Sequence, residues 1–123
     1  MPGKFVLWVS AFMFIAYGLA CLISPPLAAG LAGLELASAD ALPEIGAMYG
    51  GLQTGFGFFC LLGAVKTEFY RPALILLLVC IGGLALARCF WTFSAGAAVS
   101  GYTWGAMAFE YTIAILAAIA LRK

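Results

Sequence analysis

Two oppositely charged residues, Arg88 and Glu110, stand inside long apolar runs and are the side chains best placed to do chemistry. Arg88 lies in the run 72–94 and Glu110 in the run 104–121, and runs of this length are typical of membrane-spanning helices. A charge deep in hydrocarbon costs at least about 2.5 to 3.5 kcal/mol, so such residues are usually paired or mark a functional site. Arginine carries five donors, and a carboxylate can accept two of them side by side. The two residues are therefore predicted to meet.

Two interpretations of this pair stay open. In the first, Arg88 and Glu110 form a neutral ion pair that fixes the register of two helices, since buried pairs often specify geometry. In the second, they belong to a site that opens to the outer side and holds an anion, a proton or a lipid headgroup, because ionisable residues within membranes often mark pathways.

Other kinds of chemistry have little support in the sequence. The chain has no histidine, the commonest metal ligand and a frequent general base. Its cysteines form no CxxC motif, so we expect inert thiols, with a Cys21–Cys89 disulfide as the alternative. The sequence has no phosphate-binding loop and no nucleophile elbow. We therefore expect no catalytic residue, no metal, no cofactor and no nucleic-acid partner, and a protein that is not an enzyme.

The composition indicates the elements that must position these residues. Of 123 residues, 66% are hydrophobic and 9% are charged, whereas about a quarter of an average soluble domain is charged. Four apolar runs approach the roughly 20 residues that cross a bilayer, and they predict helices at about 5–24, 43–65, 72–94 and 104–121. We expect the first to be retained, because it is longer than the apolar part of a signal peptide. Residues 1–123 are thus predicted to form one transmembrane domain.

Short connections predict an all-α integral membrane bundle of four helices, running up, down, up and down. Pro43 and Pro72 are predicted to open the second and third helices. The connection 25–42 is expected to be either a short helix in the membrane interface or an irregular loop.

The charged residues outside the runs predict the orientation. The basic residues fall on one side of the bundle and the acidic residues of the first connection on the other. The basic set is Lys4, Lys66, Arg71, Arg122 and Lys123, and the acidic set is Glu35, Asp40 and Glu44. Because positive residues stay on the cytoplasmic side, both termini are predicted to be cytoplasmic. We expect a multi-pass protein of the bacterial inner membrane.

Glycine is concentrated in the second run, where small residues let helices approach closely. The residues expected to pack helices together are Gly46, Gly50, Gly51, Gly55 and Gly57. Steps of three and four residues place most of these glycines on the same face as Tyr49 and Gln53. Leu52, Phe56 and Phe59 are then left for lipid or another subunit.

The rise of about 1.5 Å per residue allows the depths of the polar side chains to be compared. Tyr17, Tyr49, Arg88 and Glu110 all fall about 9 to 11 Å from the outer helix ends, and Gln53 lies one turn deeper. These five residues are predicted to form one polar tier near the outer face.

Three stretches resemble a known family. They are Glu44-Ile-Gly-Ala-Met-Tyr-Gly-Gly-Leu52, Gly82-Gly-Leu-Ala-Leu-Ala-Arg88 and the single acidic residue Glu110 of the last run. Together they resemble small bacterial four-helix membrane proteins, known only as a domain of unknown function and distantly similar to DoxX-like proteins. The resemblance covers nearly the whole chain. It implies the four-helix fold and topology, and it implies no particular reaction.

Two classes of function follow from these observations. The first is a non-enzymatic accessory or scaffolding subunit that assembles with itself or with a larger membrane complex through glycine-rich and aromatic faces. The alternative is a carrier or channel for a small solute or a proton that uses Arg88 and Glu110. In both, membrane lipid is an expected partner.

Overall fold

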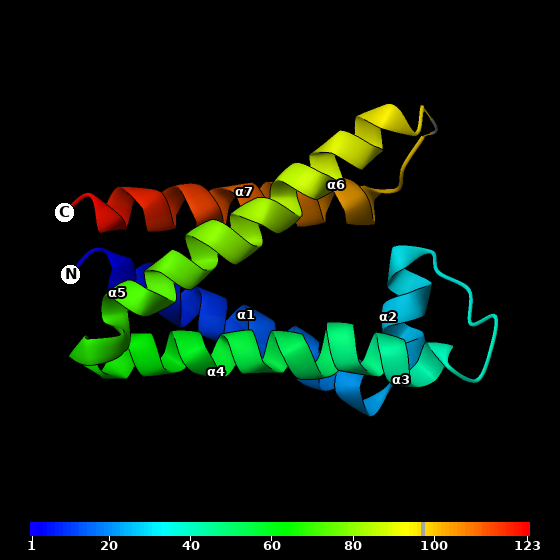
Figure 1. Ribbon diagram of the computed structural model, residues 1–123, viewed down its shortest axis with the longest axis horizontal. Coiled ribbons are helices and arrows are strands. Elements are labelled where there is room, and N and C mark those ends of the chain that lie inside the picture. Colours follow the sequence, from blue (N-terminus) through cyan, green and yellow to red (C-terminus); the bar gives the residue numbers. More distant parts are fainter. Residues whose placement is uncertain (97) are drawn as a thin grey trace.

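A computed structural model describes residues 1–96 and 98–123 of the chain. The described chain is all-helical, without strands, and its spans run up and down in turn (Figure 1). Four helical stretches are long and apolar enough to cross a membrane: Gly3–Ile23, Ala41–Val65, Thr67–Ser94 and Gly101–Leu121. The chain is therefore a multi-pass membrane protein, as its composition predicted.

The two middle spans are each built from three consecutive helical segments. The second span consists of α3 (Ala41–Ile45), the π-helical η1 (Gly46–Gly51) and α4 (Leu52–Val65). The third span consists of α5 (Thr67–Leu76), the π-helical η2 (Leu77–Ile81) and α6 (Gly82–Ser94). The first and last spans, α1 (Gly3–Ile23) and α7 (Gly101–Leu121), are continuous α-helices. A further short helix, α2 (Pro25–Ala32), follows α1.

The first connection combines the two forms expected for it. Residues Pro25–Ala32 are helical, and the backbone leaves the helix at Gly33, whose φ of 73° suits glycine. In Figure 1, α2 stands across the long axis of the bundle at the end away from the termini. Ala28 and Ala29 of α2 pack against Cys21 and Ile45 in a small buried cluster, so α2 ties α1 to the second span there.

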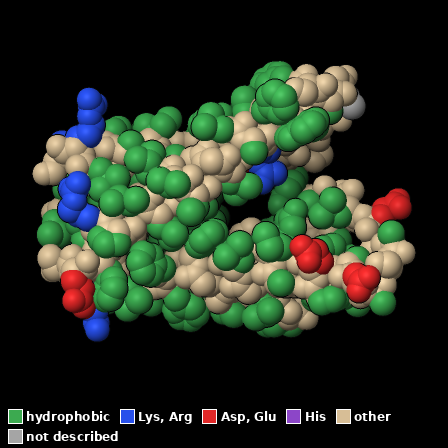
Figure 2. All heavy atoms as spheres, viewed as in Figure 1, with side chains coloured by type: hydrophobic (Ala, Val, Ile, Leu, Met, Phe, Trp, Pro, Cys, Tyr) green, Lys and Arg blue, Asp and Glu red, His purple; other side chains and the backbone are tan. Residues whose placement is uncertain are grey.

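Both termini lie at the same end of the bundle (Figure 1). Lys and Arg side chains gather at that end and three acidic side chains at the opposite end (Figure 2). This distribution matches the helix bounds, because Lys4, Lys66, Arg71, Arg122 and Lys123 all lie at or beside helix ends on the terminal side. Glu68, at the start of α5, is also on that side. Charge is thus segregated along the bundle axis.

α1 and α4 form the closest helix pair, and glycine permits it. A Cβ added at Gly50 would lie 2.6 Å from the Cα of Leu22, and one added at Gly57 would lie 2.7 Å from the backbone nitrogen of Ile15. Gly18 makes the reciprocal approach, to the backbone nitrogen of Thr54. Close backbone approach at small residues is the usual way that helices pack in membranes.

For Gly51 and Gly55 the structure differs from the prediction. Neither has any atom within 4 Å of an added Cβ, and both are exposed. They point away from α1 because they lie one and two residues from the packed positions Gly50 and Gly57, on the other side of the helix. Gly46 faces Pro25, where an added Cβ would lie 3.3 Å from the ring.

The main core fills the half of the bundle that carries the termini. Its largest fully buried side chains are Leu7, Leu74, Leu77 and Ile81, from α1, α5 and η2. The hydroxyl of Tyr70 accepts a 2.9 Å hydrogen bond from the backbone nitrogen of Gly3, a helix-end donor that has no partner within α1. This half of the bundle is closed by apolar packing.

The two prolines do not open their helices as predicted. The second span begins at Ala41, so Pro43 stands inside the first turn, where its missing N–H is tolerated. The third span begins at Thr67, after an extended Lys66, and Pro72 lies inside α5. The helix therefore starts five residues earlier than the sequence suggested.

The third span crosses the bundle diagonally, and α6 moves away from α4 along its length (Figure 1). At 28 residues it measures about 42 Å, which is longer than a hydrocarbon core of about 30 Å, and a span of excess length usually tilts. Ala85 is the one buried residue of α6, and the backbones of α4 and α6 do not approach each other closely in the described chain. A hollow therefore remains between these two helices.

Candidate functional site

The structure brings Arg88 of α6 and Glu110 of α7 together. Arg88 Nε donates to Glu110 Oε1 at 2.8 Å, and Nη2 donates to Oε2 at 2.9 Å, so the carboxylate accepts two parallel hydrogen bonds. The Glu110 side chain is 7% exposed and that of Arg88 is 26% exposed. Each carboxylate oxygen thus accepts one hydrogen bond from Arg88, whereas Nη1 of Arg88 has no hydrogen-bond partner among the described residues.

A pair of tyrosines forms the second polar contact of the site. The hydroxyls of Tyr17 on α1 and Tyr102 on α7 share a hydrogen bond of 2.9 Å. The polar tier predicted from the sequence did not include Tyr102. The spacing held a signal, because Tyr102, Ala106 and Glu110 follow each other by four residues along α7 and so lie near one face.

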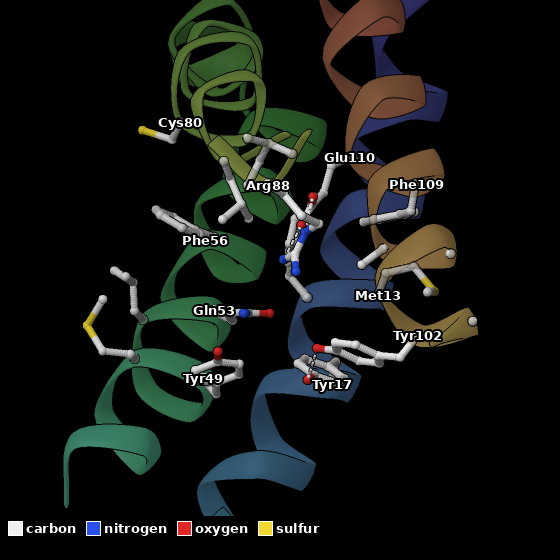
Figure 3. A pocket seen from close by; sticks show the side chains of 18 residues that line it. Met13, Tyr17, Tyr49, Gln53, Phe56, Cys80, Arg88, Tyr102, Phe109 and Glu110 are labelled. Atoms are coloured by element: carbon white, nitrogen blue, oxygen red, sulfur yellow. Dashed lines mark hydrogen bonds and ion pairs between the residues drawn. The ribbon is translucent and has the colours of Figure 1, made fainter. Parts of the chain in front are cut away.

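Gln53 and Tyr49 complete the polar set from the second span. Figure 3 shows the Gln53 amide pointing between the ion pair and the tyrosine pair, with Tyr49 beside it. Neither side chain has a hydrogen-bond partner within the described chain. All five residues of the predicted tier thus lie around one space, but Tyr17, Tyr49 and Gln53 do not bind the ion pair.

That space is a cavity of about 770 Å³ between α1, the second span, the third span and α7. Its polar lining consists of the residues just described. The rest is mostly apolar and includes Met13, Phe14, Met48, Leu52, Phe56, Ile81, Leu84 and Phe109. A cavity of about 300 to 1,000 Å³, mainly apolar and with a few converging polar groups, is typical of a small-molecule site.

Three aromatic rings lie where the cavity meets the main core. Phe14 of α1 makes edge contacts with Phe56 and Phe109, with ring centroids 6.2 and 5.8 Å away. Phe56 and Leu52 therefore line the cavity, although the sequence had left them for lipid or another subunit. The tilt of the third span leaves the space that they face, and a face count along a single helix cannot reveal it.

The cavity reaches the side of the bundle. Figure 2 shows the surface hollowed between the second span and α6, and we call this gap the side opening. Its rim includes Met48, Leu52 and Leu84, whose exposed fractions are 49%, 43% and 40%. Because the sides of a transmembrane bundle face lipid, the opening connects the cavity with the hydrocarbon of the bilayer.

Both π-helical segments contribute to the cavity wall. η1 supplies Met48 and Tyr49, and η2 supplies Cys80 and Ile81. π-helical turns are rare and are often found at functional sites. Two of them on opposite sides of one cavity support the view that this space has a function beyond packing.

The cysteines show no reactive arrangement. Cys21, Cys60, Cys80 and Cys89 are free thiols, so the alternative Cys21–Cys89 disulfide is absent. The part of the chain that the structure describes holds no group of three or more potential metal ligands.

Comparison with known proteins gives the family of the chain. No curated protein and no solved structure matches it. The likeness to DoxX-like proteins and the bacterial source therefore stay predictions. Residues 3–121, which include all four spans and the whole cavity wall, match a family described as a domain of unknown function, and the chain thus belongs to the DUF4345 family.

Proposed function

We propose that this membrane protein is a non-enzymatic binding protein or carrier for a small amphiphile, which it takes up from the outer half of the bilayer. The observation that carries the proposal is the cavity of about 770 Å³ with a polar tier in its wall and an apolar side opening. Such a space offers hydrocarbon contacts to a tail and hydrogen bonds to a head.

The position of the core supports a carrier or binding protein rather than a channel. Below the cavity, the half of the bundle that holds the termini is filled by Leu7, Leu74, Leu77 and other apolar side chains. A channel for a proton or ion would need polar groups or water through that half. The described residues of the core offer an apolar barrier instead.

An accessory or scaffolding subunit is the second candidate, and one observation favours it. Gly51 and Gly55 lie four residues apart on an exposed face of the second span, with open space beyond them. This is the small-residue spacing at which transmembrane helices associate. The support for association with another subunit is weaker than the support for ligand binding. The other two glycines of this part of the span, Gly50 and Gly57, pack against α1 of the same chain and are not available to a partner.

We further propose that the protein lies in the bacterial inner membrane with both termini in the cytoplasm. The gathering of Lys and Arg at the terminal end supports this orientation, because positive residues favour the cytoplasmic side (Figure 2). The cavity then lies toward the outer leaflet.

Cavity filling tests ligand binding directly. Ala106 lines the cavity, whereas Ala108 on the same helix is exposed outside it. Protein from vesicles that contain monooleoylglycerol, oleyl alcohol and lysophosphatidylcholine is released into detergent and weighed by native mass spectrometry. We expect one retained amphiphile in the wild type and in Ala108→Trp, and loss of it in Ala106→Trp. Equal retention in both variants would mean that the amphiphile sits on the outer surface, and would refute the proposal.

A further inference from the structure

The charges in the cavity wall restrict the head that the ligand can carry. Arg88 and Glu110 are the two charged residues among those that line the cavity, and they are bonded to each other. The described wall therefore has no net charge. An anion or a cation that entered would bring an uncompensated charge into a mainly apolar space, which is costly.

Neither member of the pair can serve a charged ligand without breaking the pair. A cation would bind to the Glu110 carboxylate, but both oxygens of this carboxylate already accept hydrogen bonds from Arg88. An anion that took over Nε and Nη2 of Arg88 would leave Glu110, with a side chain 7% exposed, unpaired. The pair thus disfavours both signs of charge.

The hydrogen bonds left over favour acceptors on the ligand. Nη1 of Arg88 keeps both of its N–H groups, and the Gln53 amide and the Tyr49 hydroxyl have donors without partners in the described chain. The hydrogen bond between Tyr17 and Tyr102 uses one of their two hydroxyl hydrogens. Unused donors therefore outnumber the unused strong acceptors of the wall, which are the Gln53 carbonyl and the second lone pair of each Glu110 carboxylate oxygen.

We propose that the cavity takes an amphiphile whose head is uncharged and rich in oxygen acceptors, such as the ester and hydroxyl oxygens of a monoacylglycerol, with its tail at the side opening. This inference rests on the binding function proposed above and specifies the class of ligand. Met48, Leu52 and Leu84 at the rim give the tail apolar contacts on its way to the bilayer.

The test compares two probes that differ by one phosphate. Wild-type protein in phosphatidylcholine vesicles is labelled with 1-oleoylglycerol that carries a photoreactive diazirine in its acyl chain. Unlabelled 1-oleoylglycerol and 1-oleoylglycerol 3-phosphate then compete with the label. We expect the label to attach to cavity residues. Competition by 1-oleoylglycerol 3-phosphate should need a concentration at least about ten times that of unlabelled 1-oleoylglycerol, because the free energy of desolvating a charge is well above that of a tenfold change in affinity.

Variants separate charge from hydrogen bonding. Glu110→Gln frees the charge of Arg88, so the preference should shift at least about tenfold toward the phosphate. Tyr49→Phe removes one hydrogen-bond donor and should lower the affinity for the uncharged probe about two- to tenfold, the usual range for one hydrogen bond. Tyr111→Phe, on α7 outside the cavity wall, is the matched control and should leave labelling unchanged. Should Glu110→Gln fail to fold, Arg88→Gln with Glu110→Gln removes both charges and should still reject the phosphate.

The outcomes distinguish the inference from the function on which it rests. Equal or better competition by the phosphate in the wild type would overturn the uncharged head and leave the binding function standing. An unchanged preference in folded Glu110→Gln would also overturn it. If neither probe protects cavity residues from labelling, both the inference and the binding function fail.

Discussion

The contact between Arg88 and Glu110 serves two purposes at the scale of single residues. Two hydrogen bonds between opposite charges neutralise groups that would otherwise stand alone in hydrocarbon. The remaining exposure of Arg88, 26% of its side chain, faces the cavity and leaves Nη1 free to donate. The two interpretations open at the outset, an ion pair and a site, are therefore compatible in this geometry.

The energetic role of the pair can be separated from its role in binding. In Glu110→Leu, Arg88 loses its partner, and we expect the free energy of unfolding to fall by about 3 kcal/mol. In the double variant Arg88→Met with Glu110→Leu no charge remains unpaired, so stability should return to within about 1 kcal/mol of wild type or exceed it. Unfolding by SDS in mixed micelles measures both. A double variant as unstable as the single one would contradict this account.

The pairing of Arg88 with Glu110 could be predicted from the sequence because hydrocarbon leaves a charge few alternatives and the depths along the helices match. The partner of Tyr17 could not be predicted from the sequence. A neutral hydroxyl near a helix end can bond to water, to a headgroup or to another side chain, so the Tyr17–Tyr102 contact depends on how α1 and α7 approach. Gln53 was predicted one turn deeper than the other four residues, but its amide points between the ion pair and the tyrosine pair (Figure 3). Its lack of a hydrogen-bond partner also became visible only in three dimensions.

At the scale of elements, the second span presents two different faces. Gly50 and Gly57 press against α1, while Leu52, Gln53 and Phe56 face the cavity. The π-helical η1 contributes to this division, because a π-helical turn holds an extra residue and rotates the residues before it relative to those after it. The α-helical spacing of three and four residues therefore does not predict which residues share a face on the two sides of such a turn.

Glycine positions on the two faces should respond differently to substitution. Gly50→Ala and Gly57→Ala place a methyl group against the backbone of α1, and each should lower the free energy of unfolding by about 1 to 3 kcal/mol. Gly51→Ala and Gly55→Ala add a methyl group to open space and should change it by less than about 0.5 kcal/mol. Unfolding by SDS in mixed micelles compares the four. Large losses at Gly51 or Gly55 would point to contact with another subunit.

The four spans were predictable because length and hydropathy decide them, whereas the helix starts were not. The sequence predicts a third helix that starts at Pro72, yet Thr67–Arg71 extend it by more than one turn before the proline. Those five residues lengthen the predicted span of 23 residues, about 35 Å, to one of 28 residues, about 42 Å. The tilt of the third span and the separation of α4 from α6 depend on how the four helices pack, and a single helix boundary cannot reveal that.

At the scale of the whole molecule, charge and cavity are arranged along one axis. Both termini and all basic residues except Arg88 lie at one end, the acidic residues of the first connection lie at the other, and the cavity lies away from the basic end (Figure 2). The sequence predicted this polarity from short loops alone. It could not predict the cavity, which is a property of four helices together.

Labelling of single cysteines tests the orientation. In a chain with its four native cysteines replaced, Glu35→Cys should react with a membrane-impermeant maleimide in intact cells, and Lys66→Cys should react only after the membrane is broken. The two sites lie in connections at opposite ends of the bundle, so each controls for the other. Reaction of Lys66→Cys in intact cells would reverse the assigned orientation.

The side opening determines how the affinity of this protein for a ligand should be expressed. A ligand that reaches the cavity through the side of the bundle is dissolved in lipid, so its occupancy follows its mole fraction in the leaflet and not its concentration in water. Added lipid then dilutes the ligand even at constant volume. It also supplies competing acyl chains, which can enter the same opening. A dissociation constant for this site is therefore best stated per lipid molecule, and bilayer composition becomes one of its variables.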